Sequence, residues 1–218
     1  MTDPISDALR DTVGDQEVGR RLPRALTPFR TPAYRWLAVS LTASSFAAGV
    51  WVVALVWEVI ALGGGPRDLS FVTTASAIGV LLPALVAGVV ADRVPQRLIL
   101  VAVAVVEVLG MGLVALLSSM GLGSLWLLAA VAFTTGMGMA FYYPAYSAWL
   151  PALVPESQLQ AVNGFEGMVR PTIGQAVGPA VAGAVVATAS PSTAFAVAAG
   201  SSVVTVLSLL KVPQTPIR

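Results

Sequence analysis

The sequence predicts an all-α membrane protein with six transmembrane helices. Hydrophobic residues make up 56% of the chain and charged residues only 11%, and the mean hydropathy is +0.83. A soluble domain typically carries about 25% charged residues, because its surface faces water. The charges are also clustered, since eleven of the twenty-three lie in the first 35 residues. Most of the surface of this chain therefore has to face lipid.

Residues 1–33 form a polar tail that contains five acids and four prolines. This composition favours disorder, and a short amphipathic helix lying on the membrane remains the alternative for part of the tail. We expect the membrane bundle to occupy residues 34–210. Residues 211–218 then begin a cytoplasmic linker.

Six apolar stretches follow the tail, and each is near the ~20 residues that a helix needs to cross a bilayer core. We expect the spans at residues 36–62, 70–91, 98–118, 124–148, 161–187 and 192–210. Turn residues separate them. In chain order these are Gly63 to Pro66, Asp92 to Arg97, Gly121 to Gly123, Pro151 with Pro155, and Ser190 with Pro191.

The distribution of Lys and Arg predicts that both termini face the cytoplasm. With six spans, ten basic residues fall on the side of the termini, and Arg67 alone falls in a link on the other side. Basic residues concentrate in cytoplasmic segments of membrane proteins. Tryptophans near span ends are expected in the interfacial belts, with Trp36 and Trp149 at the inner interface and Trp57 and Trp126 at the outer one.

Several chemistries are excluded by composition. The chain has no Cys and no His, which removes thiol nucleophiles, disulfides, His-based triads and the usual zinc ligands. Lys211 is the only lysine, and no glycine-rich run precedes it, so a P-loop is absent. A net charge of +1 gives no reason to expect nucleic acid binding. We expect a protein that is not an enzyme and uses no cofactor or metal.

The link between the second and third spans carries the most specific motif. It contains Gly88, Asp92, Arg93 and Arg97, so an acid ends one helix and bases lead into the next. This segment resembles the signature of the major facilitator superfamily, Gly-x-Leu-Ala-Asp-Arg-x-Gly-Arg-Lys, in the same link. The resemblance covers the chain from about residue 30. It implies half of a twelve-helix fold built of two inverted three-helix repeats, and a loop that switches conformation during transport.

A second motif lies in the fifth span, where Gly174, Gly178, Pro179 and Gly183 form a run of small residues around a helix kink. Small residues at this spacing let two helices pack closely, and a generic packing face is one interpretation. The run is also similar to the antiporter motif of the same superfamily. That resemblance implies an exporter that exchanges its substrate for protons, with the motif packing the two halves together.

The fourth span and the link after it resemble bacterial exporters of the enterobactin-exporter type, which belong to the same superfamily. The similar segments run from Phe141 to Ala145, from Leu150 to Glu156 and from Ala161 to Asn163. The resemblance implies efflux of drugs, siderophores or secondary metabolites through a bacterial inner membrane. Proton-coupled relatives often hold an Arg where this chain has Ala132, so the chain departs from the usual coupling route at this position.

Ionisable residues inside the spans are candidate sites, because each is costly to place in lipid. Glu107 lies in the middle of the third span and is either a proton carrier or a hydrogen-bonding partner of a neighbouring helix. Glu166 and Arg170 are four residues apart, so they share a helix face and form a pair, for which we favour a structural role over a substrate site. Glu58 lies near the outer boundary, where we expect it to reach water.

The resemblance implies the N-terminal half of a proton-coupled exporter that works by alternating access. Its partners are then the lipid bilayer, a small-molecule substrate, the proton, and either a missing C-terminal half or a second copy of the chain. We expect a truncated or split gene product, or a half-size transporter that dimerises. A non-transporting membrane fragment, or an assembly or regulatory partner, is the alternative from another class. The sequence identifies neither the substrate nor the coupling ion.

Overall fold

A computed structural model describes residues 24–214, and within this range the chain is helical without strands. Residues 1–23 of the predicted tail and residues 215–218 of the predicted linker lie outside the described residues. The elements, in chain order, are η1 (Arg24–Arg30), α2 (Pro32–Ala61), α3 (Pro66–Leu81), α4 (Ala84–Arg93), α5 (Gln96–Ser119), α6 (Leu125–Leu153), α7 (Glu156–Val169), η2 (Arg170–Val177), α8 (Gly178–Thr188) and α9 (Pro191–Lys211).

Four of the described helices, α2, α5, α6 and α9, are long and apolar enough to cross a membrane. The helices α3 and α4 make a fifth candidate if the pair, bent by 46°, is counted as one span. The bend lies next to Pro83, whose ring cannot fit a straight helix. The fifth predicted stretch is one unbroken helical run of three parts, α7, η2 and α8. Each part is shorter than a span, so six spans remain a prediction.

Helix ends follow local sequence signals. Pro32, Pro66 and Pro191 each begin a helix, where the missing N–H costs nothing. Gly63 and Gly121 take φ values of +78° and +72° directly after α2 and α5, a conformation that suits glycine at a helix end. These features explain why the predicted turns lie where the structure has them.

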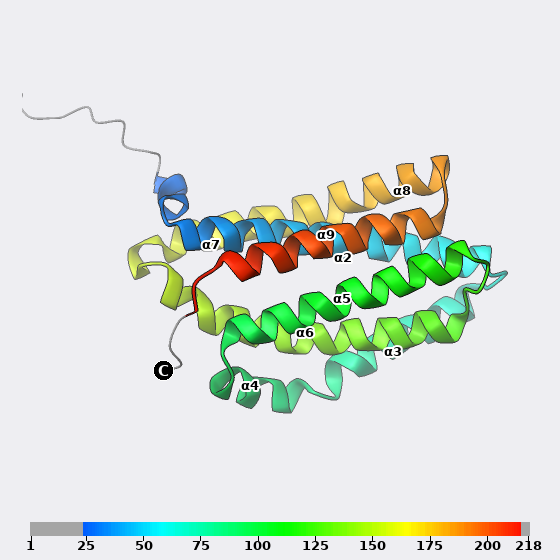
Figure 1. The fold of residues 1–218 in the computed structure, drawn as a ribbon, viewed down its shortest axis with the longest axis horizontal. Coiled ribbons are helices and arrows are strands. Elements are labelled where there is room, and N and C mark those ends of the chain that lie inside the picture. Colours follow the sequence, from blue (N-terminus) through cyan, green and yellow to red (C-terminus); the bar gives the residue numbers. More distant parts are fainter. Residues whose placement is uncertain (1–23, 215–218) are drawn as a thin grey trace, which may run out of the picture.

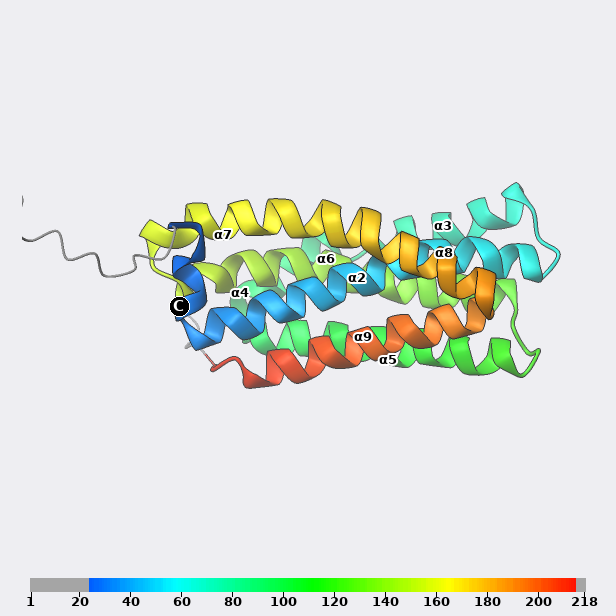
Figure 2. The same cartoon turned by 90° about the horizontal axis from the view of Figure 1, so that it is seen from above.

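The helices lie side by side along one axis (Figure 1). The order across the bundle is α7–η2–α8, then α2, α9, α5, α6 and finally α3 with α4. Figure 2 shows that η1 and the end of α9 lie at the same end of the bundle. We call this end, which carries Arg35, Arg93, Arg97 and Lys211, the basic end. That the basic end faces the cytoplasm remains a prediction.

Two predictions, for the end of the tail and for one tryptophan near a span end, are wrong in the described residues. Residues 24–30 form a 3₁₀ helix rather than a disordered segment, because Phe29 packs edge-on against Tyr34 and Phe165, with ring centroids 5.2 and 5.0 Å apart. Trp149 is wholly buried in the core instead of facing the inner interface. Trp126 is exposed, as expected of a belt residue.

Candidate functional site

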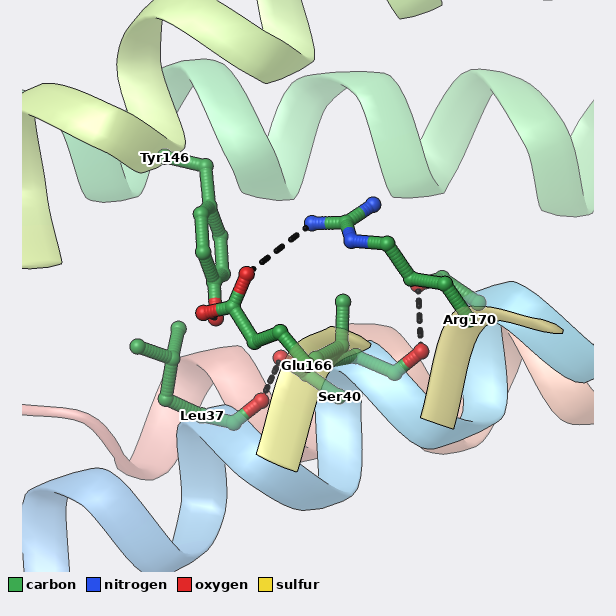
Figure 3. A network of polar contacts seen from close by, with 7 residues as sticks. Leu37, Ser40, Tyr146, Glu166 and Arg170 are labelled. Atoms are coloured by element: carbon green, nitrogen blue, oxygen red, sulfur yellow. Dashed lines mark hydrogen bonds and ion pairs between the residues drawn. The ribbon is translucent and has the colours of Figure 1, made fainter. Parts of the chain in front are cut away.

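All four tyrosines of the chain gather around one ion pair inside the bundle. The Tyr146 hydroxyl donates a 2.6 Å hydrogen bond to Oε1 of Glu166, and Nη2 of Arg170 lies 3.3 Å from Oε2 of the same carboxylate (Figure 3). We call this group, made of Tyr34, Tyr142, Tyr143, Tyr146, Glu166 and Arg170, the tyrosine cage.

The aromatic rings of the cage also hold the guanidinium. Arg170 lies over the rings of Tyr143 and Tyr146, at 5.3 and 5.8 Å from their centroids, which is within cation–π range. Tyr142 stacks on Tyr146 with 5.6 Å between centroids and 15° between planes. Tyr142 and Tyr146 share a face of α6 because they are four residues apart. The cage thus joins α6 to the fifth predicted span.

Tyr34 brings α2 to the same place. Its ring is buried against Phe165, and its hydroxyl has no hydrogen-bond partner within the described residues. The hydroxyl lies within electrostatic range of Glu166. From the same helix, Ser44 lies near the Tyr142 hydroxyl. Three elements that are distant in sequence therefore meet at the cage.

The two partners of the ion pair differ in how far their side chains are exposed. The side chain of Glu166 is 13% exposed and that of Arg170 is 30% exposed. A charge in a low-dielectric environment needs a partner and hydrogen bonds, and Glu166 has both. Loss of the negative charge on Glu166 would remove the ionic partner of Arg170.

A π-helix starts at this pair. The segment η2 runs from Arg170 to Val177, and the N–H of Gly178 bonds to the carbonyl of Ile173, five residues earlier. Pro171 is the second residue of this segment and Pro179 follows its end by two residues, and both lack the N–H groups that a regular α-helix would use there. Wide turns of this kind are rare and are often found at functional sites. Pro179 predicted a kink in this helix, but the sequence did not predict the wider turn before it.

The predicted antiporter motif packs against α2 of the same bundle. A Cβ atom added at Gly178 would lie 2.9 Å from the carbonyl oxygen of Phe46 and 3.0 Å from Cα of Gly49. One added at Gly174 would lie 3.2 Å from the carbonyl oxygen of Ser45. Nothing lies within 4 Å of the corresponding position at Gly183. Only the Gly183 end of the motif is free for a contact outside the described residues.

Glu107 lies on the inward face of α5, half-buried among buried neighbours. Val103, Met111 and Val114, which share its helix face, are 8%, 3% and 0% exposed. The carboxyl group is within electrostatic range of the Tyr142 hydroxyl. The structure therefore places a second acid on the inward face of α5, and its role stays a prediction.

Glu58 lies in the last turn of α2, at the end opposite to the basic end. The expectation that it reaches water is wrong, because the residue is only 5% exposed. The turn at Gly123 covers it, and a Cβ atom on that glycine would lie 2.8 Å from Oε1 of Glu58. Glu58 is therefore not part of the tyrosine cage.

The predicted switch loop lies at the basic end, between α4 and α5. Asp92 and Arg93 are exposed and form no ion pair within residues 24–214, and Gly88 has open space around it. Arg97 instead binds the end of α9, where its Nε donates to the carbonyl of Leu209 at 3.2 Å and its Nη2 to the next carbonyl. A cation at a helix C-terminus satisfies carbonyls that lack partners. Of the four loop residues, Arg97 is the one whose side chain hydrogen-bonds to another helix within the described residues.

Sequence reasoning missed most of the cage. It singled out Glu166 and Arg170, used Tyr142 and Tyr143 only for a resemblance, and left Tyr34 and Tyr146 out. The i, i+4 spacing of Tyr142 and Tyr146 was the available signal. Within the described residues, no group of three or more acids comes together to hold a metal ion.

A family model described as a transmembrane secretion effector matches residues 24–216, which is most of the chain. No curated protein matches it significantly.

Proposed function

The chain belongs to the transmembrane secretion effector family of the major facilitator superfamily, and from this premise we propose that it is one six-span half of a proton-coupled exporter. Membership supports a membrane transporter with a small-molecule substrate. Drugs, siderophores or secondary metabolites are the proposed substrate class, and a bacterial inner membrane is the proposed location.

The pairing of helices supports two inverted three-helix repeats. The proposed first span, α2, packs on the sixth span, α9, as the fourth, α6, packs on the third, α5. Likewise α2 contacts the fifth span through η2 and α8, as α6 contacts the second span through α3 and α4. The third and sixth spans contact each other. These are the contacts expected of two inverted repeats related by one pseudo-twofold axis.

The tyrosine cage is the observation that carries the proposal of proton coupling. Glu166 is held by a neutral donor, Tyr146, and by a cation, Arg170. A proton competes for this carboxylate with a substrate that carries a positive charge or donates hydrogen bonds to it. Exchange of substrate for protons requires such competition. Binding of either ligand changes the charge beside η2, where the helix has a wider turn. Glu107 is the second carboxyl group available for the same task.

Aromatic faces fit the proposed substrate class. Tyr142 and Tyr143 present rings beside the charged pair, and planar or aromatic molecules stack on such rings. Ligand sites commonly combine aromatic walls with a few polar groups. In transporters built of repeats, the substrate binds between two bundles near the middle of the membrane. A second bundle is therefore needed to close the site.

Efflux from liposomes tests this function. The purified chain is reconstituted with an imposed proton gradient, and efflux of cationic dyes and siderophores is measured as the protein density rises. We expect no transport from single chains, because alternating access needs two bundles. Gradient-driven efflux is expected when a second copy or a separate second bundle is present.

Each other outcome counts against a specific part of the proposal. Robust efflux from single chains would contradict the half-transporter. An efflux rate that does not depend on the proton gradient would contradict proton coupling. No efflux of any compound at any density, with or without a second bundle, would favour the non-transporting assembly partner.

A further inference from the structure

A groove opens on the side of the bundle, at its basic end, between η1, α2, the fifth predicted span and α9. Its volume is about 580 Å³. The walls are apolar, and a single basic side chain lies among the lining residues. The residues that matter here are Phe29, Arg35, Val39, Phe46, Phe165 and Ile173.

The groove faces away from the tyrosine cage. Arg35, Val39 and Phe46 lie on one face of α2, since a helix turns about 100° per residue. Ser44, which lies near the Tyr142 hydroxyl, is on the opposite face of α2. The groove is therefore separate from the proposed substrate site between bundles, and its open side faces lipid.

The length of the groove matches one leaflet. Arg35 and Phe46 are eleven residues apart on α2. At 1.5 Å per residue this is roughly 16 Å, about half of the ~30 Å hydrocarbon core. Val39 is 41% exposed in the groove, and Phe165 and Ile173 form the facing wall. An extended acyl chain has the shape and polarity to cover these side chains.

The charge of the groove matches an anionic headgroup. Arg35 is exposed and has no ion pair within the described residues. It lies at the basic end, which the distribution of Lys and Arg assigns to the cytoplasmic side. That leaflet carries the anionic lipids of the membrane, which attract basic side chains near its surface.

We propose that this groove binds one anionic phospholipid of the cytoplasmic leaflet. One acyl chain lies along α2 from Val39 to Phe46, and the phosphate contacts Arg35. Phe29 and Phe165, whose rings meet at 5.0 Å, close the groove near the headgroup. The bound lipid thereby holds η1 against α7.

Native mass spectrometry of the full chain tests the proposal. The protein is released from mixed micelles that contain phosphatidylglycerol and phosphatidylcholine with identical acyl chains, and retained lipids are counted. We expect one retained lipid, with phosphatidylglycerol preferred roughly five-fold, the factor that one basic residue supplies near an anionic surface. Arg35→Gln should remove this preference, and Arg35→Lys should keep it. Val39→Trp, which fills the groove, should reduce retention of both lipids.

Arg67→Gln is the matched control, because it removes the same charge from an exposed site at the opposite end of the bundle. It should keep the preference. An equal loss in Arg67→Gln and Arg35→Gln would overturn the proposal, as would equal retention of both lipids by the wild type. A lipid-free dimer would assign the groove to a second copy instead, and a lipid-free monomer would contradict any lipid site.

Discussion

Gly178→Ala should weaken the packing of the fifth predicted span on α2. The added Cβ atom would lie 2.9 Å from the carbonyl oxygen of Phe46, 3.0 Å from Cα of Gly49 and 3.1 Å from the carbonyl oxygen of Ile173. All three are backbone atoms, so no side chain can rotate to make room. Phe46 and Gly49 belong to α2, so the two helices have to separate to relieve these contacts. Overpacking of this kind costs about 1–3 kcal/mol.

Gly183→Ala is the control in the same helix. Nothing lies within 4 Å of its new Cβ atom, so only the backbone effect of replacing glycine remains. That effect favours Ala in a helix by about 0.5–1 kcal/mol and applies to both variants. The difference in unfolding free energy between the two variants is therefore expected to equal the overpacking cost of about 1–3 kcal/mol.

Equilibrium unfolding in mixed micelles with increasing SDS measures this difference, with far-UV circular dichroism as the readout. Gly178→Ala should unfold at lower SDS than the wild type, and Gly183→Ala at the same or higher SDS. Equal midpoints for the two variants would refute the reasoning, because Gly178 would then not hold α8 against α2.

Two further predictions concern the loops. The Asp92→Asn variant should insert into the membrane normally but lose most efflux in the transport-competent assembly, because the exposed acid is proposed to hold one conformation closed. Efflux at the wild-type rate would mean that the loop only anchors the topology. If both termini face the cytoplasm, a Cys introduced at position 121 or 190 should react with an impermeant maleimide in intact cells, and one introduced at position 96 or 157 should not. Labelling reports only the introduced Cys, because the chain has no native Cys. The reverse labelling pattern would overturn the orientation.

Hydropathy and turn residues predict the helix positions well, because each helix must be apolar over its own length. The four long spans and the turns at Gly63 and Gly121 follow from local sequence. Internal irregularities were harder to predict. The bend beside Pro83 and the π-helix that contains Pro171 depend on how neighbouring helices accommodate a proline, and a hydropathy pattern contains no such information.

The candidate site was predicted only where it is local. Glu166 and Arg170 are neighbours on one helix, so their spacing predicts their contact. Tyr146 reaches Glu166 from another helix, and Tyr34 comes from a third. Such contacts depend on how the helices cross. The burial of Glu58 also depends on a turn from elsewhere in the chain, which covers a position that the sequence placed at the membrane boundary.

Comparison of Glu166→Gln with Glu156→Gln tests proton coupling at the tyrosine cage most directly. Glu156 begins the same helix, is exposed and has no ion pair within the described residues. In the transport-competent assembly, Glu166→Gln should abolish efflux driven by a proton gradient but retain substrate exchange at equal pH on both sides. Glu156→Gln should retain both activities. Gradient-driven efflux at the wild-type rate in Glu166→Gln would contradict the account, and loss of both activities would assign Glu166 a structural role.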